Sequence, residues 1–229
     1  MADSKYSRRQ MLRSIVAGAG ASLAGATVLD LASPRRIEAQ TNLSPDAALR
    51  ELIAGNDRSV ANQLISVQTD LEVLRNHTAD KQEPFAAVLA CADSRVPVEL
   101  IFDQTIGRLF VTRVAGNLVT PEIIASLEYA VAVLGVKAIL VLGHTNCGAV
   151  KAAMKGETVP GQISALYPPL YRAVEHSGGD LARAIRTNAN VQAELLRTSS
   201  TVIREAVSAA KVTVASGVYD LSSGKVSLM

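Results

Sequence analysis

Three short runs of apolar residues stand out along the chain, each bounded by polar residues, proline or glycine. They cover residues 85–91, 109–114 and 138–144. Each run has the length of a strand and is too short for a typical buried helix. Strands of parallel sheets are covered on both faces and therefore consist of apolar runs of this kind. The three runs predict buried parallel strands.

Segments in which apolar residues recur at helical spacing lie between and around these runs. The first covers residues 44–76 and begins with Ser44-Pro45-Asp46, an N-cap followed by proline at the first helical position. A helix over residues 121–134 separates the second and third runs. Further helices are expected at residues 147–154, 163–174 and 180–210, the last either continuous or broken.

The end of the chain predicts a hairpin, because residues 211–219 and 225–228 flank a turn signal at residues 220–224. Strands that alternate with helices indicate parallel crossover units. We therefore expect an α/β fold with a mostly parallel central β-sheet flanked by helices and a C-terminal hairpin. In sheets of this kind, ligands bind beyond the carboxyl ends of the strands.

The composition agrees with this fold class and narrows the function. Hydrophobic residues make up 48% of the chain, but aromatic residues only 3% and tryptophan is absent, so the core must be aliphatic. The formal net charge is +2, and its basic excess lies in residues 1–39, so the remainder is close to neutral. No basic stripe or aromatic platform for nucleic acid is present in the sequence.

The first residues have the features of an export signal. Arg8 and Arg9 form a twin-arginine pair ahead of the uncharged, Ala- and Gly-rich stretch of residues 14–29. That stretch is shorter than the about 20 residues that a membrane-spanning helix needs. It matches the apolar region of a signal peptide, and the paired arginines resemble a twin-arginine (Tat) export signal.

We therefore predict a signal segment at residues 1–39, with cleavage after Ala39, and a single domain at residues 40–229. The protein would be exported in its folded state by the Tat machinery and would be periplasmic or secreted. The alternatives are an uncleaved anchor and a disordered tail. Export after folding would allow a metal to be loaded in the cytoplasm, where thiols remain reduced.

The candidate chemistry lies at the ends of the predicted strands. Cys91 ends the first strand, His144 ends the third, and Cys147 begins the helix that follows. Two thiolates and an imidazole are good zinc ligands, and three protein ligands with one open position are typical of catalytic zinc. The helix N-terminus favours the thiolate of Cys147. The alternatives are two buried free cysteines, a Cys91–Cys147 disulfide and a closed structural zinc site.

The segments around these residues resemble the β-carbonic anhydrase family. The matching segments are Cys91-Ala-Asp-Ser-Arg-Val96, Arg113-Val-Ala-Gly-Asn117 and Gly143-His-Thr-Asn-Cys-Gly148, and the resemblance covers residues 44–229 in order. It implies a zinc enzyme that reversibly hydrates carbon dioxide to bicarbonate and a proton by means of zinc-bound hydroxide. It also implies that the zinc ligands are the two cysteines and the histidine.

The resemblance assigns catalytic roles to Asp93 and Arg95. Asp93 could fill the fourth zinc position in an inactive resting state, whereas a clamp by Arg95 would keep it ionised and off the metal. Family members with a closed site often carry a tryptophan at the position of Val88, so this chain is expected to be of the open type. An ion pair at a helix end is the structural alternative for the two residues.

The family's substrate pocket matches five more positions. Gln82 would donate a hydrogen bond to bicarbonate, Phe110 and Tyr129 would line the apolar side, and Ala115 and Gly148 would leave room for the substrate. Phe110 and Tyr129 would otherwise be ordinary core residues. In the family this pocket forms between two subunits, which implies a homodimer or a homotetramer.

Two other functions fit the same residues. One is a carbonyl sulfide or carbon disulfide hydrolase, which would use the same nucleophile on a similar linear electrophile. The other is an inactive zinc-binding homologue, although Asp93, Arg95 and Gln82 are all present.

Overall fold

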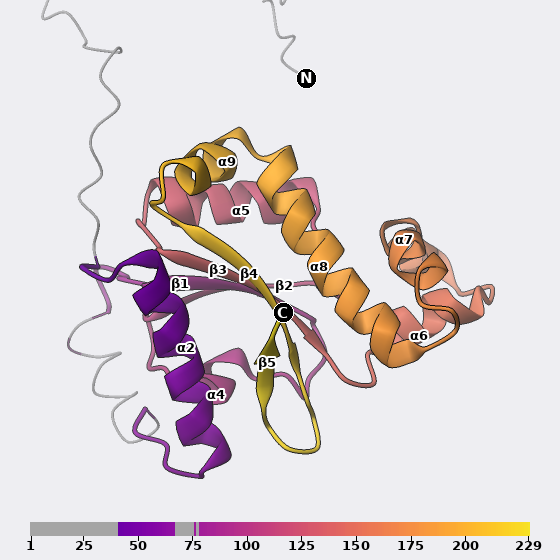
Figure 1. Ribbon diagram of the computed structural model, residues 1–229, viewed down its shortest axis with the longest axis horizontal. Helices are drawn as coiled ribbons and strands as arrows, with labels where there is room; N and C mark the ends of the chain where they lie inside the picture. Colours follow the sequence, from indigo (N-terminus) through magenta and orange to yellow (C-terminus); the bar gives the residue numbers. More distant parts are fainter. Residues whose placement is uncertain (1–40, 67–75, 77) are drawn as a thin grey trace, which may run out of the picture. The chain divides into compact units, whose positions relative to one another are not determined.

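The computed structural model of the chain describes residues 41–66, 76 and 78–229. In this part, a sheet has the strand order β2-β1-β3-β4-β5 (Figure 1). The first four strands run parallel, and β5 is antiparallel to β4. The expected α/β fold with a C-terminal hairpin is confirmed. The strands are β1 (Ala86–Ala90), β2 (Leu109–Arg113), β3 (Ala138–His144), β4 (Thr213–Tyr219) and β5 (Val226–Leu228).

Helices cover both faces of the sheet (Figure 1). Along β1, Val88 belongs to the core cluster on the side of α2 and α4, and Leu89 belongs to the cluster on the side of α5, α8 and α9. Every residue of β1 and β3 is buried, which explains their uninterrupted apolar sequences. The α-helices are α2 (Pro45–Val60), α4 (Val98–Ile101), α5 (Pro121–Ala132), α6 (Gly148–Lys155), α7 (Tyr171–Glu175), α8 (Leu181–Ser199) and α9 (Thr201–Ser208). Two 3₁₀ helices, η1 (Gly161–Leu166) and η2 (Pro168–Leu170), precede α7.

One expected helix boundary was wrong, and one expectation that was left open is decided by the structure. The helix expected over residues 44–76 begins as predicted, with the Ser44 side chain accepting a hydrogen bond from the Ala47 amide, but α2 ends at Val60. Asn62 has a left-handed backbone with φ of 56°, which no α-helix continues through. Residues 61–66 are not helical, and residues 67–75 and 77 lie outside the described part. The expected helix was therefore wrong over residues 61–66, whereas residue 76 is helical.

The helical region of residues 180–210, expected to be either continuous or broken, is broken. It divides at Ser200, which has an extended backbone and whose Oγ accepts a hydrogen bond from the Ile203 amide. A side-chain oxygen in this role is the usual cap of a new helix, so α9 starts in a new direction. In the residues that the structure describes, no helix is long and apolar enough to span a membrane.

Gly55 allows α2 to approach the end of α4 closely. A Cβ atom at this position would lie 1.9 Å from the carbonyl oxygen of Phe102. We expect Gly55→Ala to lower the free energy of unfolding by about 2–3 kcal/mol, because backbone must move to make room. Calorimetry should show a decrease in Tm of roughly 4–10 °C. Ala54→Ser, at the exposed neighbouring position of the same helix, is the control, and an equal Tm for the two variants would contradict the close approach.

Candidate metal centre

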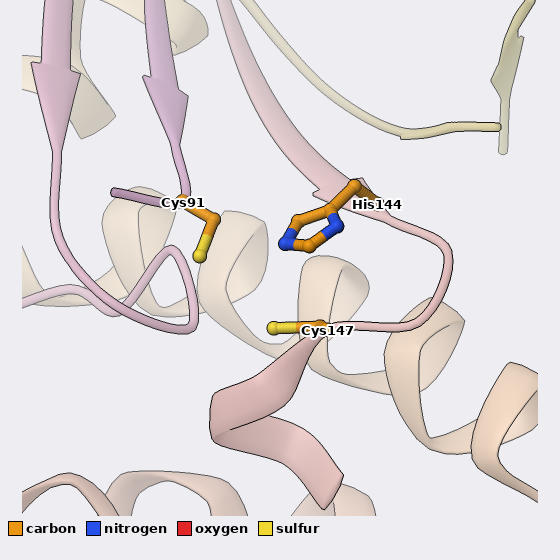
Figure 2. Close-up of side chains that lie close together, drawn as sticks. All are labelled: Cys91, His144 and Cys147. Carbon is orange, nitrogen blue, oxygen red and sulfur yellow. The ribbon is translucent and has the colours of Figure 1, made fainter. Parts of the chain in front are cut away.

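The three predicted metal ligands meet at the carboxyl edge of the sheet. Cys91 directly follows β1, and His144 is the last residue of the neighbouring strand β3. Asn146 has a left-handed backbone with φ of 58°, so the chain turns sharply after His144 and brings Cys147 to the start of α6. Figure 2 shows the three side chains pointing toward one another from these elements. Parallel pairing of β1 and β3 therefore places the cysteine of one strand beside the histidine of the other.

The geometry suits a small metal ion. The two sulfur atoms and a ring nitrogen of His144 all lie within 4.8 Å of one another. Ligands of tetrahedral zinc lie about 3.3–3.8 Å apart, so small side-chain movements would complete the coordination. Cys91, His144 and Cys147 are 4%, 0% and 1% exposed. The surrounding protein therefore shields the three ligand side chains from solvent.

The ring of His144 is oriented for metal binding by its own backbone. Its Nδ1 lies 2.9 Å from the carbonyl oxygen of Thr145. A carbonyl only accepts, so Nδ1 carries the proton and Nε2 has a free lone pair. Within the described residues, Nε2 is buried and has no hydrogen-bond partner. A buried nitrogen without a partner costs stability, and a metal ion at this point would remove that cost.

The two thiols share a proton and stabilise negative charge. The pKa of Cys91 is lowered to about 4, first by the hydrogen bond from Cys147 and then by His144 and the Gly116 amide, against the effect of burial. The pKa of Cys147 is raised, because its proton is held by Cys91 and because it is buried. The pair therefore favours one thiolate over two neutral thiols, and thiolate sulfur is the form that binds zinc.

Asp93 lies beside this cluster but is held by Arg95. Its Oδ1 accepts hydrogen bonds from the backbone N–H and the Nε of Arg95, at 3.0 and 2.9 Å, and its Oδ2 accepts one from Nη2 at 2.7 Å. These bonds hold the pKa of Asp93 well below its usual range. The Oδ2 atom is 3.8 Å from Nε2 of His144. The carboxylate is therefore ionised and lies close to the metal ligands. It is held by Arg95, as expected for the open type of site, in which Asp93 does not bind the metal.

Two groups that the sequence reasoning missed support the segment after β1. The Nε of Arg113 donates to the carbonyl oxygen of Cys91 at 3.0 Å, and its Nη2 donates to that of Asp93. The amide of Gly116 donates to the Cys91 sulfur at 3.3 Å. Both residues belong to the segment Arg113–Asn117 on which the family resemblance rests, and that motif was the only signal for them.

Of the five predicted pocket residues, the structure places two next to the ligands. Ala115 adjoins Gly116, which contacts Cys91, and Gly148 directly follows Cys147. Gly148 is exposed, and a Cβ atom there would meet nothing within 4 Å. The space beside Cys147 is therefore open to a small molecule.

The other three pocket residues lie elsewhere on the same chain. Phe85 precedes β1 and stands about 20 Å along the strand direction from Cys91, so Gln82, three residues earlier, is out of reach of the metal ligands. Phe110 is paired with Ala87, in the first half of β1. Tyr129, on α5, has its ring centroid 6.3 Å from that of Phe110. One chain alone does not bring Gln82, Phe110 and Tyr129 to the metal ligands.

Comparisons with known proteins agree with this centre. A family model described as carbonic anhydrase matches residues 86–226. A carbonic anhydrase of Mycolicibacterium smegmatis is 36% identical over 197 residues, which cover 82% of this chain and 94% of that protein. Carbonic anhydrase 2 of Mycobacterium tuberculosis is 44% identical over 123 residues, which cover 52% of this chain and 59% of that protein. Among solved structures, a tetrameric β-carbonic anhydrase of Sordaria macrospora superposes with a TM-score of 0.64 at 25% identity, covering 71% of this chain and 91% of the other.

Proposed function

Because this chain belongs to the β-class carbonic anhydrase family of lyases, we propose that it interconverts carbon dioxide and bicarbonate at a zinc ion held by Cys91, His144 and Cys147. The observation that carries the proposal is the convergence of two sulfurs and an unpartnered imidazole nitrogen within 4.8 Å. Both cysteines are free thiols, so a disulfide does not account for their closeness.

The chemistry that zinc supplies when bound by three such ligands is a lower pKa of water, and hence a hydroxide nucleophile near neutral pH. The protein's own part lies with Asp93. Two hydrogen bonds occupy its Oδ1 and one occupies its Oδ2, so a lone pair of Oδ2 is left on the side of His144. This oxygen accepts a hydrogen bond from the attacking group and orients it, and Arg95 keeps the carboxylate out of the ligand position.

Carbon dioxide is small and apolar. The residues next to the metal ligands have small side chains or none, so they leave room for it to approach. Gly148 has none, and Ala115 has only a methyl group. We propose that a second copy of the chain supplies Gln82, Phe110 and Tyr129, which one chain keeps away from its own metal ligands. This requires a homodimer or a homotetramer, and the similar Sordaria macrospora enzyme is described as tetrameric.

Mixing two impaired variants tests whether the site is shared. We expect Gln82→Leu to retain zinc and to lower kcat/KM about tenfold or more, because the product loses a hydrogen-bond donor. Cys147→Ala should lack metal. If a twofold dimer exchanges the pocket residues, mixed dimers regain one complete site, and an equimolar mixture has about a quarter of all sites intact. Mixed dimers verified by native mass spectrometry that gain no activity would contradict the shared pocket.

Stopped-flow hydration of carbon dioxide, with zinc quantified in the same preparation, tests the function itself. We expect activity in proportion to bound zinc. Carbonyl sulfide and carbon disulfide are assayed in parallel, because they would react with the same nucleophile. Preferential turnover of either sulfur compound would reassign the substrate. Zinc-loaded protein that is inactive on all three would identify a binding homologue.

We also propose that the protein is exported to the periplasm by the twin-arginine pathway, and that residues 1–39 are removed. The support is Arg8-Arg9 ahead of the uncharged stretch of residues 14–29, all of which lie outside the described residues. Replacing both arginines with lysine should retain the protein in the cytoplasm, because the pathway reads the pair. Cell fractionation with immunodetection measures this. Unchanged export of that variant would rule out the route.

A further inference from the structure

The buried face of α8 carries two amide side chains in an otherwise apolar setting. Asn188 and Gln192 are each 1% exposed, one helical turn apart. Their buried neighbours on this helix are apolar: Ala184, Ile185, Ala189, Ala193 and Leu196. Burying an amide costs free energy unless its polar atoms are hydrogen-bonded. Such residues therefore need hydrogen-bond partners that offset this cost.

The partners of these amides belong to the loop after β2 and to each other, and Gln192 Nε2 also donates to the carbonyl oxygen of Pro169 at 3.4 Å. Asn188 Nδ2 donates to the carbonyl oxygen of Gly116 at 2.8 Å. Gln192 Oε1 accepts from the amide of Val119, also at 2.8 Å. Gln192 Nε2 donates to Asn188 Oδ1 at 3.1 Å and braces that side chain. The two amides therefore hold the loop at both Gly116 and Val119.

Gly116 is the point where this loop reaches the metal centre. Its N–H donates to the Cys91 sulfur, and its carbonyl is the group that Asn188 holds. Its φ is 79°, a left-handed conformation that glycine adopts without strain. The following residue, Asn117, is left-handed too, with φ of 47°. A loop of this shape needs outside contacts to fix the direction of its amides, and Asn188 provides one.

The same helix also supports the second strand of the centre. A Cβ atom on Gly143, the residue before His144, would lie 3.3 Å from Ile185 Cγ2 and 3.6 Å from Ala189 Cβ. Figure 1 shows α8 lying along the sheet beside β3 and β4. One helix thus contacts the backbone next to His144 and the loop that contacts Cys91.

We propose that Asn188, braced by Gln192, is a positioning residue of the metal centre: it orients Gly116 so that its N–H donates to the Cys91 sulfur. The inference rests on the proposed zinc site. An N–H bonded to a thiolate withdraws electron density from sulfur and holds it in one direction. Removing Asn188 should therefore weaken zinc binding and strengthen electron donation from Cys91 to the metal. Loss of hydrogen-bond partners of metal ligands commonly costs 10–100-fold in metal affinity or activity.

The test compares Asn188→Leu, which keeps the branching at Cγ and removes the donor, with Ser200→Ala. Ser200 is equally buried and hydrogen-bonded, but it lies at the other end of α8. Zinc affinity is measured by chelator competition, and the Co²⁺-substituted proteins are compared by absorption. We expect the zinc Kd to rise at least tenfold and the thiolate-to-cobalt band to shift in Asn188→Leu. Ser200→Ala should lose stability but keep the Kd within twofold and the band unshifted.

An unchanged Kd and cobalt band in Asn188→Leu would overturn the inference while leaving the zinc site intact. Failure of the wild type to bind zinc would instead overturn the proposed function. Gln192→Met removes the brace on Asn188 together with the contacts to Val119 and Pro169, but leaves the bond from Asn188 to Gly116, so it should give a smaller change in the same direction. If neither variant folds, the wild type loaded with cadmium-113 is studied by NMR spectroscopy to test the hydrogen bond between the Gly116 amide and the Cys91 sulfur. Scalar coupling from the metal through sulfur to the Gly116 amide proton is expected, and its absence would overturn the inference.

Discussion

Replacing Cys147 with alanine should abolish stoichiometric zinc binding and lower kcat/KM for carbon dioxide hydration by at least about 10³-fold. Two ligands hold zinc far more weakly than three, and the nucleophile is generated at the metal. The effect should also be large because Cys147 is 1% exposed and supplies one of the three ligand atoms that lie within 4.8 Å of one another, so that its loss leaves two. Metal analysis after dialysis and stopped-flow hydration measure the two losses.

His176→Ala is the matched control for Cys147→Ala. His176 is an exposed histidine whose Nδ1 contacts the carbonyl of Arg172 on the same short helix. Its removal should leave zinc content and activity unchanged. Stoichiometric zinc with near-normal turnover in Cys147→Ala would mean that the ion sits elsewhere, and the assignment of this centre would fail.

Asp93→Asn should retain zinc and lower kcat about 10²–10³-fold, because the amide presents a donor or a weaker acceptor where the attacking group needs a carboxylate oxygen. The hydrogen bonds from Arg95 keep the pKa of Asp93 far below neutral. A carboxyl with a depressed pKa is ionised above that value, so Asp93 keeps its charge throughout pH 6–9. The ratio of wild-type to variant activity should therefore be constant over this range.

Ser94→Ala is the control for Asp93→Asn, since Ser94 is exposed and lies between the two members of the pair. Its activity should match that of the wild type. Two results would contradict the role of Asp93: an activity within about threefold of the wild type, or a loss of zinc from Asp93→Asn. The second result would make the carboxylate a support of the metal instead of a partner of the reaction.

The positions of Cys91 and His144 could be predicted because a simple rule applies to them. Both end apolar runs of strand length, and parallel strands bring their carboxyl ends to one edge. The supporting amides followed no such rule. Asn188 and Gly116 are 72 residues apart, and helical periodicity identifies a buried face without saying what that face touches. The hydrogen bonds at the Cys91 sulfur were therefore visible only in the fold.

The wrong end of the first expected helix has the same origin. Apolar residues keep helical spacing past Val60, but Asn62 adopts a left-handed conformation and stops α2. Propensity does not exclude asparagine from a helix, so this end is decided by local backbone geometry. Gln82 was assigned to the pocket by motif position alone. The predicted strand at residues 85–91 places Gln82 before its start and Cys91 at its end. The structure keeps the two residues apart in the same way, which is why we propose that a second subunit supplies Gln82.

The placement of two ligands on adjacent strands has a mechanical consequence. An ion bound by Cys91 and His144 ties β1 to β3 at their carboxyl ends and closes a loop of roughly fifty residues, which removes much of the freedom that this stretch has when the chain is unfolded. The energy of ion capture then adds to the energy of folding. Such a protein would have its highest stability against unfolding where zinc is abundant. Where zinc is scarce, the protein would lose its activity and would also persist for a shorter time before it unfolds.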